Sequence, residues 1–178
     1  MKIEYSLDKS DFLTYQLYAA TKSKNIKKNR RNARLIPPVF FIIVGIYLSF
    51  RDNSPIGLVI FFVLSVLWFI FYPKYQKYKY EKHYKKHIDE HYANRINIST
   101  TIEFDKEYIT SINKIGKSKI KTSEIRKMIE LKNHFLFDLL DKQALIIPKI
   151  AIEDIESFKT EMRRLNISNE DKTNWKWK

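Results

Sequence analysis

The stretch that decides the fold is LIPPVFFIIVGIYLSF (Leu35 to Phe50), followed by RDNSP (Arg51 to Pro55) and IGLVIFFVLSVLWFIFY (Ile56 to Tyr72). At about 1.5 Å per helical residue, each apolar segment reaches roughly 25 Å, close to the roughly 30 Å hydrocarbon core of a bilayer. Large apolar residues cover every helical face, which disfavours the alternative of a buried hairpin in a soluble protein. The sequence therefore predicts two transmembrane helices joined by a short turn, and we expect Pro37 and Pro38 in the first turn of the first helix.

The positive charge of the chain flanks this apolar block. The 178 residues have a net charge of +13, yet residues 35–72 hold only one basic and one acidic side chain. Because basic residues accumulate on the cytoplasmic side, we expect both termini to be cytoplasmic, with the turn between the two spans on the other side of the membrane. Thirteen basic residues are expected to contact the anionic lipid surface. They are Lys22, Lys24, Lys27, Lys28, Arg30, Arg31, Arg34, Lys74, Lys77, Lys79, Lys82, Lys85 and Lys86.

Composition excludes several classes of protein. The chain has no Cys, which excludes disulfide scaffolds, thiolate metal clusters and Cys nucleophiles. Its three glycines are isolated, so no glycine-rich phosphate loop exists. Basic residues alternate with aromatic residues only near Lys77 to Tyr80, which does not favour nucleic acid as a partner. No nucleophile, base and orienting group stand together, and we predict no enzyme and no cofactor.

A histidine repeat is the one pattern that resembles a metal site. His83, His87 and His91 recur every four residues. Two imidazoles at this spacing can face one ion on a helix, but all three cannot without a partner element. The favoured interpretation is a solvated, Lys-rich helix without a metal. His134 stands at the expected start of a strand, next to Asn133, which is interpreted as a turn residue.

The regions around the hairpin predict a small cytoplasmic α+β domain. Ile3, Tyr5 and Leu7 alternate with polar residues as in a strand, and a helix should begin near Asp8 and Asp11. Since a lone strand has no local partner, we expect it to join a sheet formed by the carboxy-terminal half. Residues 73–95 should extend the second span as a basic helix bent at Pro73, so that one helix covers residues 56 to about 94.

From Ile96 onward the hydrophobic period is two, which predicts a small antiparallel sheet. Breaks are expected near Asp105, at Gly116, at Asn133, and at Asp141 with Lys142. An amphipathic helix from Ile152 to Leu165, with Glu153 and Asp154 in its first turn, should close the sheet. The expected strands cover residues 96–105, 108–115, 118–122, 125–132, 134–140 and 144–148.

These features divide the chain into five regions. They are an amino-terminal strand, helix and basic flank (1–34), the hairpin (35–72), the juxtamembrane helix (73–95), the sheet domain (96–165) and a tail (166–178). The tail is polar and is expected to be frayed apart from its Trp175 to Lys178 ending, WKWK. The two tryptophans of that ending could dip into the membrane interface, but a disordered ending is the favoured interpretation.

This order of parts resembles the YcxB-like family of small bacterial membrane proteins. The resemblance depends on Ile125, Ile129, Glu130, Ile147, Pro148 and Lys149, which match the family's isoleucine, acidic strand end and Ile-Pro-Lys step. Thr122 and Ile150 stand where the family has tryptophan and arginine. The resemblance implies a pleckstrin-homology-like (PH-like) carboxy-terminal domain and leaves the activity open.

The sequence leaves three hypotheses for function. In the first, the hairpin anchors an interaction module that offers a sheet edge, or a loop from Lys117 to Lys121, to a protein partner or a second copy. In the second, an accessory or immunity protein acts through its hairpin on a membrane toxin, channel or transporter. In the third, the domain senses anionic lipid.

Overall fold

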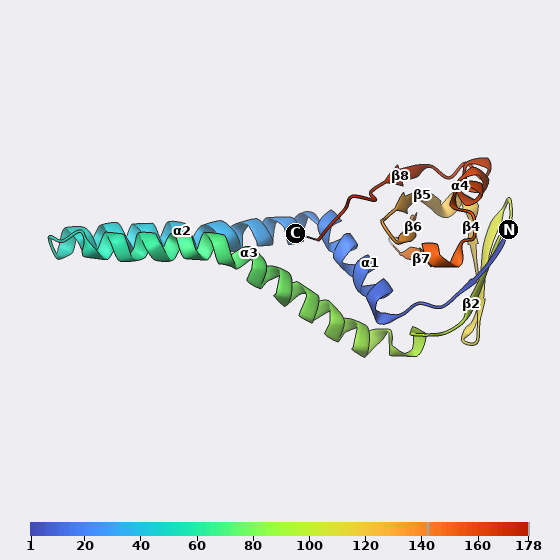
Figure 1. Cartoon of the computed structure of the whole chain (residues 1–178), viewed down its shortest axis with the longest axis horizontal. Coiled ribbons are helices and arrows are strands. Elements are labelled where there is room, and N and C mark those ends of the chain that lie inside the picture. Colours follow the sequence, from blue (N-terminus) through green and yellow to red (C-terminus); the bar gives the residue numbers. More distant parts are fainter. Residues whose placement is uncertain (142, 178) are drawn as a thin grey trace. The chain divides into compact units, whose positions relative to one another are not determined.

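The computed structural model describes residues 1–141 and 143–177 and has an α+β architecture (Figure 1). One compact unit comprises residues 1–15 and 85–176, and the other comprises residues 16–84 with Trp177. The helices are α1 (Lys9–Lys22), α2 (Lys24–Arg51), α3 (Ile56–His91) and α4 (Ile155–Arg164), with single 3-10 turns η1 (Ala93–Arg95), η2 (Thr122–Glu124) and η3 (Lys149–Ala151). The strands are β1 (Lys2–Tyr5), β2 (Thr100–Phe104), β3 (Tyr108–Asn113), β4 (Gly116–Lys121), β5 (Ile125–Glu130), β6 (His134–Leu139), β7 (Ala144–Pro148) and β8 (Asn169–Asp171).

The helical unit is a long hairpin of α2 and α3, which lie side by side in Figure 1. Both predicted apolar segments are helical, and α2 and α3 are long and apolar enough to cross a membrane. As expected, α3 continues without a break from the apolar segment into the basic one, with Pro73 inside it. Large side chains on the hairpin remain exposed, among them Phe50 at 84% and Tyr47 at 63%.

The two prolines of α2 lie inside the helix, so their expected place in the first turn was wrong. α2 begins at Lys24, where the Ser23 hydroxyl accepts a hydrogen bond from the Ile26 amide at 3.3 Å. Pro37 has no N–H to donate to the Ala33 carbonyl, the usual i−4 acceptor. The Trp68 indole N–H of α3 donates to that carbonyl instead, at 3.3 Å. A side chain of the neighbouring helix therefore compensates for the proline.

Close packing of the hairpin depends on Gly45. A Cβ added there would lie 2.9 Å from the Phe61 Cβ and 3.2 Å from the Leu58 Cα. Both distances are shorter than ordinary contacts, and the second involves backbone that cannot move alone. The missing side chain thus allows α2 and α3 to approach each other.

We predict that Gly45→Val lowers the stability of the hairpin by about 1–3 kcal/mol, as overpacking does elsewhere. Thermal unfolding of the full-length protein in mild detergent measures the effect. Gly116→Ala is the control, because a Cβ there meets nothing within 4 Å. An unchanged melting temperature for Gly45→Val would refute the close approach.

The other unit holds two four-stranded sheets. The first has the order β1-β2-β3-β4 and the second β7-β6-β5-β8. β1 pairs with β2 in antiparallel fashion, with Ile3 opposite Ile102, so the amino-terminal strand joins the sheet as predicted. The six strands expected in the carboxy-terminal half are present, but they divide between two sheets where one was predicted.

Several strand boundaries differ from the sequence prediction. β2 begins at Thr100 rather than Ile96, because Asn97 has a φ of 57° and interrupts the extended backbone. Gly116 does not break the sheet but begins β4. The turn lies one residue earlier, where the Asn113 side chain accepts hydrogen bonds from the amides of Ile115 and Gly116 at 2.8 and 3.1 Å.

The carboxy-terminal region also differs from the expected frayed tail. β8 pairs in parallel with β5, and Ile167 before it is buried. The Met128 amide donates to the Ser168 carbonyl at 2.8 Å, and Lys127 forms an ion pair with Glu170 at 2.6 Å. Polar cross-strand contacts hold this strand, and they produce no hydrophobic period in the sequence. Lys142, in one expected break, and Lys178, in the WKWK ending, lie outside the described residues.

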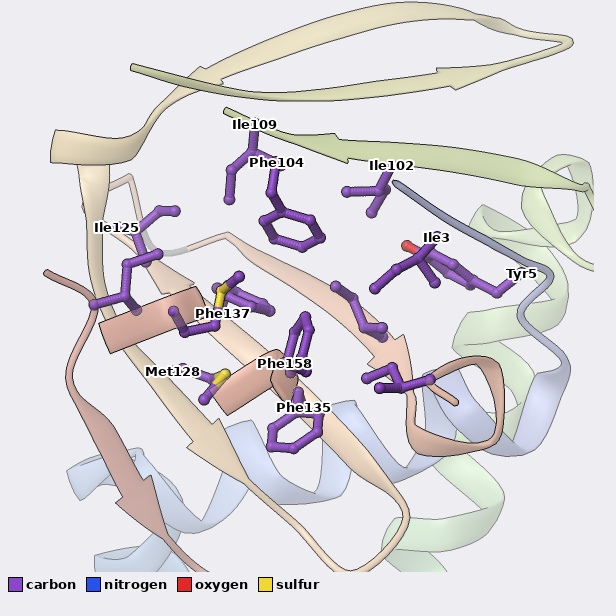
Figure 2. Close-up of a cluster of buried hydrophobic side chains, with 14 of the residues drawn as sticks. Ile3, Tyr5, Ile102, Phe104, Ile109, Ile125, Met128, Phe135, Phe137 and Phe158 are labelled. Carbon is purple, nitrogen blue, oxygen red and sulfur yellow. The ribbon is translucent and has the colours of Figure 1, made fainter. Parts of the chain in front are cut away.

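The core of this unit lies between the two sheets (Figure 2). Phe104 of the first sheet contacts Phe137 of the second, with ring centroids 5.9 Å apart. Phe158 of α4 lies 5.0 Å from the Phe135 ring and is fully buried. α4 therefore closes the core as expected, although it begins at Ile155 rather than Ile152. Asp154 precedes it and accepts hydrogen bonds from the amides that follow.

The beginning of α1 is fixed by two aspartates. As predicted, Asp8 and Asp11 cap the helix: Asp8 accepts from the Asp11 amide at 2.9 Å, and the Asp8 amide donates to Asp11 at 2.8 Å. Asp11 also lies 2.6 Å from Nε2 of His134, the first residue of β6. His134 begins a strand, as predicted, and its side chain is buried. This contact joins α1 to the second sheet.

Removing either partner of this pair should destabilise the domain. We predict that His134→Ala and Asp11→Ala each cost about 1–3 kcal/mol, because each leaves the other, largely buried, side chain without its partner. In a double-mutant cycle measured by urea unfolding, the coupling energy should be at least about 0.5 kcal/mol. Strictly additive effects would show that the contact contributes nothing.

Candidate functional site

A cleft of about 780 Å³ opens at one end of the two-sheet unit. One wall is the inner face of the first sheet, and the opposite wall is the β6–β7 hairpin from Leu139 to Ile146. Phe12 and Tyr15 of α1 and Tyr92 after α3 complete the lining. A volume in this range is typical of sites for small ligands or peptide side chains.

The polar character of the cleft follows from the register of the first sheet. Ile3, Ile102, Ser111 and Ser118 lie in one row across the four strands, on the same face as the core residue Phe104. Toward β1 this row is apolar and belongs to the core, whereas toward β4 it ends in two serines. The serine end lines the cleft. Polar side chains on an inward face, where packing favours apolar ones, are consistent with a binding surface.

The charge in the cleft is positive. Its lining includes Arg95 and Lys117 and, among the residues that the structure describes, contains no Asp or Glu. Arg95 is exposed and lies 6.0 Å from the Tyr92 ring centroid. Burial raises the pKa of the nearby Tyr5 phenol, which therefore stays neutral. The site offers hydrogen-bond donors, aromatic surface and positive charge, which suit an anionic or acidic ligand.

β4 lies beside the cleft and forms the free edge of the first sheet. The segment Lys117 to Lys121 was considered a loop, but it is most of this strand. Its residues are exposed except Ile120, which packs against the core. Lys119 lies 5.2 Å from the Tyr108 ring of β3. The edge therefore combines a rigid backbone with exposed positive charge.

A buried ionic network lies at the end of β5. The Glu130 carboxylate accepts from Lys149 at 2.7 Å, from Lys159 at 3.0 Å and from the Asn169 amide at 3.2 Å. Glu130 is only 6% exposed. Burial alone would raise its pKa, but the hydrogen bonds from Lys149, Lys159 and Asn169 outweigh that effect and lower the pKa. The network joins β5 to the segment after β7, to α4 and to β8.

We predict that Glu130→Gln costs about 3 kcal/mol at pH 7, because it leaves buried ammonium groups without their counter-ion. Since the folded protein lowers the pKa of Glu130 below 4.5, the stabilisation is complete above pH 4.5 and is lost as the pH falls through the folded-state pKa. In urea unfolding measured from pH 7 to pH 3, the difference in free energy of unfolding between Glu130→Gln and wild type should narrow below pH 4.5.

The control is Glu156→Gln, because Glu156 also contacts Lys159, at 3.2 Å, but its side chain is 75% exposed. Its effect should stay within about 0.5 kcal/mol at every pH. A Glu130→Gln deficit that does not change with pH would contradict an ionised Glu130.

The predicted lipid-contacting residues lie on the helices around the hairpin. Those from Lys24 to Arg34 are on α2 and those from Lys74 to Lys86 are on α3, while Lys22 ends α1. Two arginines make specific contacts. Arg30 donates to Gln76 at 3.1 Å and lies 4.4 Å from the Trp177 ring, and Arg34 lies 4.1 Å from the Phe69 ring.

Trp177 is packed rather than disordered, contrary to the expected disordered ending. It is 7% exposed, and its ring lies edge-on to Tyr80 of α3 with centroids 5.7 Å apart. The Trp177 ring and the Arg30 guanidinium form a cation–π contact, which no local sequence pattern indicates.

The histidine repeat lies on α3 as expected. The rings of His87 and His91 are 4.3 Å apart, and the His83 ring packs against Tyr84. Within the described part of the chain, no group of three or more His, Cys, Asp or Glu is placed to hold a metal ion. The repeat therefore offers no geometry on which to build a metal site.

The cleft was not predicted from the sequence. Its lining combines residues from six strands, α1 and the segment around Tyr92, which are distant in sequence. The one available signal was the serines at positions that should face inward, and it becomes readable only once the strand register is known.

Comparison with known proteins gives one match. The model of the YcxB-like protein family matches residues 104–162, from the end of β2 to α4. No curated protein and no solved structure matches the chain. The match includes Glu130 and Lys149, the acidic strand end and the lysine of the Ile-Pro-Lys step, which the structure joins in an ion pair. The resemblance to the YcxB-like family is thereby confirmed over residues 104–162 of this chain.

Proposed function

We propose that this protein is a membrane-anchored interaction module. The hairpin of α2 and α3 inserts into the bacterial cytoplasmic membrane, with both termini cytoplasmic. The folded unit of residues 1–15 and 85–176 is PH-like and binds a protein partner through the cleft and the β4 edge. The observation that carries the proposal is the cleft without acidic residues beside a free strand edge, on the same chain as two exposed apolar helices.

Membrane insertion is supported by the surface of the hairpin. Its exposed side chains include Phe40 at 60%, Ile43 at 59% and Phe62 at 57%. Exposed apolar side chains along two long helices are unfavourable in water and favourable in lipid. Basic residues lie on both flanks and few charges lie between them, as the positive-inside rule requires of a cytoplasmic flank.

The placement of both flanks on one side is supported by the pairing of β1 with β2. β1 precedes the hairpin in sequence and β2 follows it, yet they share a ladder. A chain that inserts between them must therefore leave and return on the same side, which two spans accomplish.

We predict that Ile43→Lys reduces the membrane-integrated fraction of the protein. A lysine near the centre of a span costs about 2.5–3.5 kcal/mol. Resistance to carbonate extraction measures integration. Ile112→Lys is the matched control, because Ile112 is an exposed isoleucine of β3 and should leave integration unchanged. Full extraction of the wild-type protein by carbonate would refute the anchor.

Partner binding is tested in the native membrane. The tagged full-length protein is cross-linked, purified in mild detergent and analysed by mass spectrometry. Replacing the hairpin by an unrelated two-span anchor should preserve the cross-linked partner if the folded domain binds it. Loss of the partner with the exchanged hairpin would instead support an accessory protein that acts within the membrane. A particle that contains only lipid would overturn the interaction module.

A further inference from the structure

The hydrogen bonds between β3 and β4 determine which backbone N–H and C=O groups of β4 are left without a partner in the sheet. The Thr122 amide donates to the Glu107 carbonyl at 2.9 Å, immediately beyond the β3–β4 ladder. Hydrogen-bonded pairs alternate along antiparallel strands, so Ile120 and Ser118 also exchange hydrogen bonds with β3. The N–H and C=O groups of Lys117, Lys119 and Lys121 therefore point away from β3. Within the described residues 1–141 and 143–177, no strand neighbours β4 on that side.

All three residues with free backbone groups at this edge are lysines. Side chains two apart share a face, so the three lysines project from the outer face of the sheet, and Lys117, at the end of β4, also borders the cleft. None of them forms an ion pair with an acidic residue within residues 1–141 and 143–177. Such an edge disfavours pairing with β4 of a second copy, because lysines would lie opposite lysines.

The two residues between these lysines are uncharged and face the other side of the sheet. Ser118 and Ile120 point to the inner face, where both line the cleft. A strand added at this edge would also alternate, with one set of side chains beside the lysines and the other at the cleft.

We propose that β4 binds an extended acidic segment of a partner protein as an added antiparallel strand. The partner has Asp or Glu at every second position, opposite Lys117, Lys119 and Lys121, with apolar residues between them that face the cleft. Main-chain hydrogen bonds supply affinity and the charge pattern supplies specificity. This proposal rests on the proposed function and names the chemistry of the partner.

The test uses the full-length protein in phosphatidylcholine nanodiscs and a fluorescent peptide, acetyl-Val-Glu-Val-Glu-Val-Glu-Val-amide. Fluorescence anisotropy should show saturable binding above that to empty nanodiscs. A peptide of the same composition with its three Glu residues in one block should bind about tenfold or more weakly, because its charges cannot align with alternate lysines.

Backbone pairing is tested by N-methylation of the peptide. In an added antiparallel strand, the residues opposite the three lysines direct their N–H groups toward β4. Methylation of the Glu amides should therefore abolish binding, whereas methylation of the inner Val amides, which point to solvent, should preserve it. Equal binding of both methylated peptides would overturn strand addition.

Charge specificity is tested on the protein. Lys119→Glu should weaken binding about tenfold or more, because it places like charges opposite each other. Lys106→Glu is the control, since Lys106 is an exposed lysine in the β2–β3 turn and should leave binding unchanged. A variant with Glu at positions 117, 119 and 121 should prefer the peptide with Lys in place of Glu. This reversal shows that the variant folds, and its absence would overturn the proposal.

The outcomes separate this proposal from the proposed function. If the alternating peptide does not bind while the native membrane still yields a cross-linked partner, the acidic strand is wrong and the interaction module stands. If the protein is extracted by carbonate or yields only lipid, the interaction module itself is wrong.

Discussion

The ladder between β1 and β2 is the constraint on which the rest of the structure depends. It places Ile3 opposite Ile102 and brings the Met1 carbonyl to the Phe104 amide at 2.8 Å. The whole helical hairpin lies between these residues in the sequence. The domain therefore cannot complete its first sheet until the chain has made both helices and returned. A chain built this way requires an even number of crossings if the helices enter a membrane.

Buried polar contacts then fix the positions of elements around the core. The pair of Asp11 and His134 attaches α1 to the second sheet, and Glu130 gathers Lys149, Lys159 and Asn169 from three separate segments. Such contacts are costly if one partner is lost, and so they specify a single arrangement. The ion pair of Glu130 with Lys149 also gives a physical reason for two residues that carry the YcxB-like resemblance. They act together, although 19 positions separate them.

The first sheet performs two tasks with one alternating pattern. Near β1 its inward residues are isoleucines that form the core, and near β4 they are serines that line a cleft. Its edge strand has lysines where backbone groups are free. Lysines at such an edge oppose association between copies of the chain, and the same charges favour an acidic partner.

The sequence by itself determined the features that repeat with a local period or follow from composition. The uncharged runs predicted both long helices, the alternation from Ile96 onward predicted six strands, and Asp8 with Asp11 predicted a helix cap. Each depends on residues within a few positions of one another. The tertiary structure alone decided the division into two sheets, the parallel strand β8, the packing of Trp177 on Tyr80 and the burial of His134. It also decided where the cleft lies and which backbone groups at the edge of β4 are free. The physical reason is that these features depend on strand register and on contacts between distant segments, such as the Trp68 indole that serves the carbonyl left free by Pro37.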